Sequence, residues 1–107
     1  MTQFRARILV VDDDPDIRAN LADILQDMDY QVDVAADGPS ALERAGAAAY
    51  DLVLLDLRMP GMNGLEVYRQ LKRLRPDTPV IVVTAYTSGD VASEILAAGA
   101  CEIVSKP

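Results

Sequence analysis

The chain has 107 residues, the length of one domain with room for a working hydrophobic core. Its net charge of −7, from 10 basic and 17 acidic residues, disfavours direct binding to the phosphate backbone of nucleic acids. Its one cysteine excludes an intramolecular disulfide, and the lack of histidine excludes imidazole metal sites and histidine-based catalysis. Any bound metal must therefore have oxygen ligands, which favours Mg²⁺, Mn²⁺ or Ca²⁺.

Membrane insertion and export are not predicted from the sequence. No run of apolar residues approaches the roughly 18 that cross a bilayer. The apolar stretch near the N-terminus is too short for the core of a signal peptide, and it leads straight into three aspartates. The cytoplasm is therefore the expected location.

The first half of the chain alternates apolar runs with helical patterns. The continuous apolar run at 8–11 predicts a strand that is covered on both faces. A helix is expected next, because apolar residues recur on one helical face across 17–28, and Asp14 with the proline after it suits the helix start. A weaker strand at 31–35 follows. A second helix is expected to begin at Pro39.

The second half continues the same alternation. Apolar runs at 52–55 and 80–83 predict two more strands, and a shorter run at 102–104 predicts a fifth. Apolar residues at helical spacing predict helices around 65–71 and 91–96. Alternation of this kind is typical of an α/β fold, with a parallel sheet, right-handed crossovers and helices on both faces.

Polar residues follow the expected strands at their carboxyl ends, where doubly wound sheets bind their ligands. In chain order they are Asp12, Asp13, Asp14, Asp56, Thr84, Ser105 and Lys106. Grouped carboxylates repel one another unless a divalent cation offsets their charge, and Mg²⁺ suits them because it also bridges to phosphate. A carboxylate beside that ion can attack phosphorus, while a lysine and a hydroxyl offset charge on the transferred group. The pattern therefore predicts phosphoryl transfer to Asp56.

Each of these residues also has an ordinary explanation when it is taken alone. A strand-end aspartate is usually a helix cap or a turn residue, and we interpret Asp14 as such a cap and leave it out of the site. Thr84 alone would be a polar strand residue, and Lys106 alone a solvated surface lysine. The separate explanations do not account for four strands that each end in a group that phosphoryl transfer needs.

The segments ILVVDDD, DLVLLDLRMPGMNG, VIVVTAY and GACEIVSKP together resemble the receiver domain of two-component response regulators. The resemblance extends from about Arg7 to Pro107. It implies a flavodoxin-like, doubly wound five-stranded parallel sheet of strand order 2-1-3-4-5. It also implies a signalling switch that accepts a phosphoryl group from a phosphohistidine, on a sensor histidine kinase or a histidine phosphotransfer protein, and then controls an output domain or a partner.

The resemblance implies a role for each matching residue. Asp56 would accept the phosphoryl group, and Asp12 and Asp13 would hold Mg²⁺, or Mn²⁺ in its place, together with Asp56 and the backbone carbonyl of Arg58. Thr84 would bind the phosphoryl group. By the same resemblance, Lys106 would pair with it.

The sequence departs from the family pattern in two ways. Ile103 stands where receiver domains usually have the tyrosine or phenylalanine that switches rotamer, and an aliphatic side chain cannot donate a hydrogen bond. The last helix, which usually covers one sheet face, has no counterpart before the chain ends at Pro107. We therefore expect 1–107 to be a receiver domain from a longer regulator, with its output domain elsewhere and with a homodimer as one outcome of the exposed apolar surface.

Two alternative functions stay open at this point. A phosphatase of the haloacid-dehalogenase type also uses a strand-end aspartate and Mg²⁺, but its Asp-x-Asp signature with a following Thr or Val fails on DDDPD, and the chain has no room for a cap domain. A pseudo-receiver would keep the fold without being phosphorylated, which Ile103 favours and Asp56, Thr84 and Lys106 oppose. Nucleotide binding is not predicted, because neither a Walker A motif nor G-x-G-x-x-G occurs.

Overall fold

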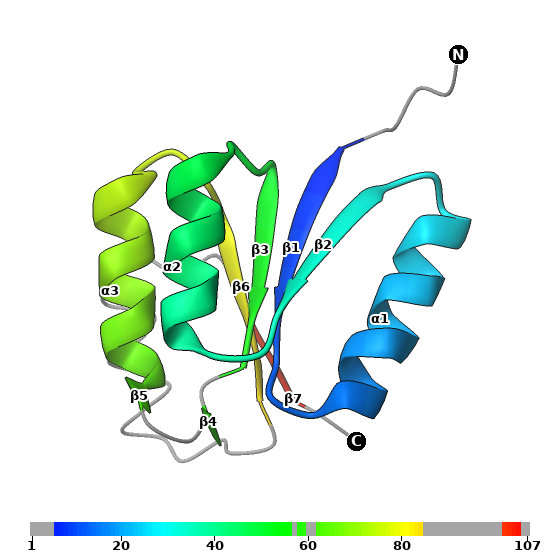
Figure 1. The fold of residues 1–107 in the computed structure, drawn as a ribbon, viewed down its shortest axis with the longest axis horizontal. Helices are drawn as coiled ribbons and strands as arrows, with labels where there is room; N and C mark the ends of the chain where they lie inside the picture. Colours follow the sequence, from blue (N-terminus) through cyan, green and yellow to red (C-terminus); the bar gives the residue numbers. More distant parts are fainter. Residues whose placement is uncertain (1–5, 57, 60–61, 85–101, 106–107) are drawn as a thin grey trace.

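The computed structural model describes residues 6–56, 58–59, 62–84 and 102–105. Five parallel strands form the main sheet in the order β2-β1-β3-β6-β7 (Figure 1). They are β1 (Arg7–Val11), β2 (Gln31–Ala35), β3 (Leu52–Leu55), β6 (Val80–Thr84) and β7 (Glu102–Ser105). Because β6 and β7 are the fourth and fifth strands of this sheet, the predicted order 2-1-3-4-5 is confirmed.

The helices among the described residues that cover the sheet are α1 (Pro15–Asp27), α2 (Gly38–Ala47) and α3 (Gly64–Leu74). The chain moves outward from β1 to β2 and then crosses back to β3, so right-handed crossovers must place α1 and α2 on opposite faces. The step from β3 to β6 runs in the same direction as that crossing, which puts α3 beside α2. Figure 1 shows this arrangement. The helix predicted around 91–96 lies outside the described residues.

A two-stranded antiparallel pair was not predicted from the sequence. It is formed by β4 (Arg58–Met59) and β5 (Met62–Asn63), between β3 and α3. Strands of two residues are too short to show a periodic pattern of apolar residues, so hydropathy carries no signal for them. This hairpin lies at the end of the sheet where β1 turns into α1 (Figure 1).

Aspartates begin the first two helices. The Asp14 side chain accepts hydrogen bonds from the backbone N–H groups of Asp16 and Ile17, so the predicted cap is confirmed. The second helix begins one residue earlier than predicted, at Gly38, because the side chain of Asp37 accepts from the N–H of Ser40 at 2.8 Å. The same hydrogen bond holds the pKa of Asp37 below its usual value.

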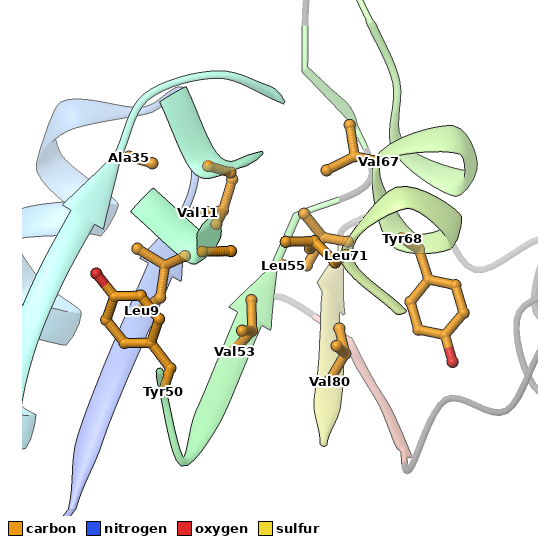
Figure 2. Packing of buried hydrophobic residues seen from close by; sticks show 12 residues of the cluster. Leu9, Val11, Ala35, Tyr50, Val53, Leu55, Val67, Tyr68, Leu71 and Val80 are labelled. Carbon is orange, nitrogen blue, oxygen red and sulfur yellow. The ribbon is translucent and has the colours of Figure 1, made fainter. Parts of the chain in front are cut away.

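The core lies between the sheet and the pair α2 and α3. Side chains alternate along each strand, so every second residue points to that side. The buried cluster, drawn in Figure 2, is Leu9, Val11, Ala35, Ala41, Ala45, Tyr50, Val53, Leu55, Val67, Tyr68, Leu71 and Val80. The described elements thus bury one closely packed layer of side chains between the sheet and the helices α2 and α3.

Within the described residues, α1 is the helix that covers the opposite face of the sheet. Ile8 and Val10 are buried beneath α1, but none of the 13 residues of α1 is itself buried. The predicted apolar face of α1 is only partly correct, because Ile24 and Met28 are 56% and 47% exposed. The half-buried residues of α1 are Ile17, Arg18, Leu21, Ala22 and Leu25, whereas Ile24 is exposed and Met28 is the C-cap.

A polar network joins three segments on the far side of the molecule from the strand-end aspartates. The Tyr50 hydroxyl donates to Asp33 Oδ2 at 2.7 Å, and Arg7 Nη2 donates to the same oxygen at 3.1 Å. The Arg7 guanidinium also lies 5.2 Å from the centre of the Tyr50 ring. The Tyr50 hydrogen bond lowers the pKa of Asp33, and burial with this bond raises the pKa of Tyr50 to about 12.

We expect Tyr50→Phe to lower the free energy of unfolding by about 1–2 kcal/mol near neutral pH, because Asp33 loses a hydrogen-bond donor. The folded-state pKa of Tyr50 lies above the ordinary value of 10.0, so its contribution is complete below pH 10.0 and is lost as the pH rises towards about 12. Urea unfolding of the wild type and the variant should therefore give curves that converge over this range.

The matched control for this experiment is Tyr30→Phe, which removes a hydroxyl from a half-buried tyrosine outside the network. This control should change the free energy of unfolding little near neutral pH. A gap between wild type and Tyr50→Phe that stays constant up to about pH 12 would show that this hydroxyl is not held as a neutral donor.

Candidate functional site

Two buried aspartates lie side by side at the carboxyl edge of the sheet. Val11 and Leu55 are paired in register, so Asp12 and Asp56 each come one residue after a paired position on neighbouring strands. Their backbone N–H groups continue the ladder, from Asp56 to Val11 O at 2.9 Å and from Asp12 to Ala35 O at 3.1 Å. The exposed fractions are only 2% for Asp12 and 4% for Asp56. The sheet therefore brings two carboxylates together where water has little access.

Asp13 completes a group of three carboxylates. One oxygen from each of Asp12, Asp13 and Asp56 lies within 4.8 Å of the others, and Asp13 is the exposed member. Because like charges at this separation repel, the arrangement favours a cation between them. Of the three side chains, Asp13 is the one that is accessible to solvent.

The three oxygens fit the geometry of a small octahedral cation. At Mg–O distances of 2.0–2.1 Å, neighbouring ligand atoms lie roughly 2.9 Å apart and opposite ones roughly 4.1 Å apart. One oxygen of each carboxylate lies within 4.8 Å of the others, so a bound cation would draw the three oxygens closer together to reach these separations. Asp12, Asp13 and Asp56 are thus a suitable donor set for Mg²⁺ or Mn²⁺.

The turn after β1 fixes Asp12 through several hydrogen bonds. The N–H of Asp14 donates to Asp12 Oδ1 at 2.9 Å, and Arg18 Nη1 donates to the backbone carbonyl of Asp12 at 2.8 Å. The sequence prediction left Asp14 out of the site, yet its backbone holds a site carboxylate. Arg18 was missed altogether, because a single arginine on a helix has no pattern that separates it from a solvated side chain.

The other predicted site residues are placed to different extents. Thr84 is the last residue of β6 and pairs with Ser105, so its backbone lies at the same edge of the sheet as Asp56. Arg58 lies in β4, where it pairs with Asn63. Lys106 lies outside the described residues. The structure therefore brings together the three aspartates and places the backbone of Thr84 at the same edge of the sheet. The roles of all these residues, and those of Arg58 and Lys106, stay predictions.

Comparison with known proteins places this arrangement in a family context. The family model described as response regulator receiver domain matches residues 8–107. The transcriptional regulatory protein ZraR from Klebsiella oxytoca is 42% identical over 107 residues, which cover all of this chain and 24% of ZraR. This chain thus spans about a quarter of the length of that curated relative.

Solved structures agree with the family match. The response regulator TrrA from Thermotoga maritima, in complex with Mg²⁺-BeF, is 42% identical with a TM-score of 0.84, over 94% of this chain and 86% of that one. A response regulator from Burkholderia pseudomallei with a phosphorylated aspartic acid and a calcium ion is 32% identical with a TM-score of 0.90, over 94% of this chain and 59% of that one. Within the described residues, no helix is long and apolar enough to cross a membrane.

Proposed function

Because the chain belongs to the response regulator receiver domain family, we propose that it is a switch that accepts a phosphoryl group on Asp56. The donor is a phosphohistidine on another protein, a sensor histidine kinase or a histidine phosphotransfer protein, since this chain contains no histidine. Receiver domains act as phosphoaspartate switches rather than as enzymes. The observation that carries the proposal is the buried carboxylate of Asp56 beside Asp12 and Asp13.

The proposed reaction uses Asp56 as the nucleophile. One of its carboxylate oxygens attacks the phosphorus of the phosphohistidine, and the oxygen–phosphorus bond forms as the nitrogen–phosphorus bond breaks. The imidazole leaves and takes a proton from solvent, and an acyl phosphate remains on Asp56. Burial of Asp56 strengthens each charge interaction around the transferred group, because little water screens it.

The metal site in this proposal consists of Asp12, Asp13, Asp56 and the backbone carbonyl of Arg58. Mg²⁺ bound there would offset the negative charge of the carboxylates and of the phosphoryl oxygens, and Mn²⁺ has the same ligand preference. Two solved relatives hold a divalent cation, Mg²⁺ in TrrA and calcium in the Burkholderia protein, which supports the assignment by likeness. The hydroxyl of Thr84 would donate to one phosphoryl oxygen, and the ammonium of Lys106 would pair with another.

The switch requires a partner that responds to phosphorylation. ZraR is by name a transcriptional regulatory protein, and this chain matches 24% of its length, so we propose control of an output domain or a separate partner. The net charge of −7 argues against nucleic-acid binding by this domain itself. We also propose a cytoplasmic location and a homodimer for this domain.

Phosphorylation from a small donor tests the proposal. After incubation with acetyl phosphate and Mg²⁺, we expect the intact mass to increase by one phosphoryl group, and Asp56→Asn and an EDTA-treated sample should show no increase. Asp77→Asn, an identical change at an exposed turn residue, should be modified like the wild type. No increase in a sample that circular dichroism shows to be folded would contradict the proposal and favour a pseudo-receiver.

A further inference from the structure

Arg18 links the first helix to the backbone of the acidic site. It lies in α1, and its side chain turns back so that Nη1 donates to the carbonyl of Asp12 at 2.8 Å. The bond is partly buried and spans six residues of sequence. A hydrogen bond from a charged donor is stronger than a neutral one, so this contact is a firm restraint on the turn.

The carbonyl that Arg18 holds belongs to the peptide group between Asp12 and Asp13. That peptide is planar, so fixing the direction of its carbonyl also fixes the direction in which the chain enters Asp13. Asp12 is already held through its N–H by Ala35 and through Oδ1 by Asp14. Asp13 is exposed, and its orientation therefore depends more on the peptide that precedes it.

We propose that Arg18 is a positioning residue for the divalent cation, acting through the Asp12–Asp13 peptide rather than by touching the ion or the phosphoryl group. The inference rests on the proposed function, since it assigns a role toward the same metal site. Residues that orient metal ligands commonly change metal affinity on the order of tenfold or more when they are removed.

The loss of Arg18 would change the affinity for Mg²⁺ in opposite directions, depending on whether its charge or its hydrogen bond matters more. Removal of a positive charge near three carboxylates makes the site more negative, which on its own would tighten the binding of a cation. Loss of the hydrogen bond frees the Asp12–Asp13 peptide, so part of the binding free energy is used to order the ligands, and binding weakens. The direction of the change in affinity therefore separates the two roles.

Calorimetric titration of Mg²⁺ into the folded chain provides the test. We expect Arg18→Met to raise the Mg²⁺ Kd about tenfold, and Arg18→Lys, which keeps a donor, to recover part of this loss. The matched control is Arg69→Met, the same substitution on the exposed side of α3, and its Kd should equal that of the wild type. Should Arg18→Met fail to fold, Arg18→Gln carries the same prediction, because its amide is too short to reach the carbonyl.

The outcomes separate this inference from the proposed function. An unchanged or lower Kd in the folded Arg18 variants would overturn the positioning role while leaving the switch intact. A wild type that binds no Mg²⁺ and gains no phosphoryl group would overturn the proposed function and this inference with it. A raised Kd that Arg18→Lys does not recover at all would also count against positioning, since the restored donor should hold the carbonyl.

Discussion

Leu55→Ala should lower the free energy of unfolding by about 2–5 kcal/mol, whereas Leu54→Ala should lower it by only about 1 kcal/mol. The two residues are neighbours on β3 and their side chains point to opposite faces of the sheet. Leu55 is fully buried in the core under α2 and α3, and its truncation leaves a cavity there. Leu54 is half-buried on the face of α1, so less apolar surface is lost.

Urea unfolding followed by far-ultraviolet circular dichroism measures both changes, since the chain has no tryptophan. The two variants are chemically identical substitutions in adjacent positions, so each serves as the control for the other. Equal losses of stability would mean that both faces of the sheet are packed alike, in disagreement with the burial of α1. A change in the slope of the free energy of unfolding against urea concentration would instead indicate that the substitution alters the unfolded state.

Mg²⁺ at a hundred times its Kd should raise the free energy of unfolding by about 2.7 kcal/mol, if the unfolded chain does not bind it. In EDTA, where no metal is bound, Asp13→Asn should have a higher free energy of unfolding than the wild type. It removes one of three neighbouring negative charges, which relieves repulsion within the acidic group. The same variant should gain much less stability from Mg²⁺, a trade of function for stability.

Thermal unfolding in EDTA and in excess Mg²⁺ tests both halves of this prediction. Asp23→Asn makes the same change at an exposed position on α1 and should leave the response to Mg²⁺ unaltered. A melting temperature below that of the wild type for Asp13→Asn in EDTA would show that the three carboxylates do not strain the metal-free site.

The parallel strands were predictable from continuous apolar runs in the sequence, whereas their order in the sheet was implied by the resemblance to receiver domains. Residues 52–55 and 80–83 are apolar throughout, which in a chain of this length fits strands buried on both faces. Parallel strands bring their carboxyl ends to one edge, so the meeting of Asp12 and Asp56 followed from the strand order alone. The predicted helix around 91–96 and the role of Lys106 remain predictions, since the structure does not describe those residues.

What the sequence did not predict depends on contacts across the fold. The pair of β4 and β5 has no periodic pattern, because each strand has only two residues. The hydrogen bond of Arg18 requires knowledge of where α1 leaves the sheet relative to the Asp12 carbonyl. The exposure of Ile24 likewise depends on how α1 is rotated on its strands, which apolar spacing fixes only approximately.

The light burial of α1 has a consequence for where the molecule opens first. Local opening in a native protein takes the elements with the fewest buried contacts, and hydrogen exchange at their amides is correspondingly fast. By this measure α1 separates from the sheet more readily than α2 or α3, each of which has buried residues. Since α1 also carries Arg18 and directly follows Asp13, each such opening loosens the acidic turn. A cation bound by that turn would therefore oppose the local opening of α1. Hydrogen exchange at the amides of α1 would then be slower when the cation site is occupied.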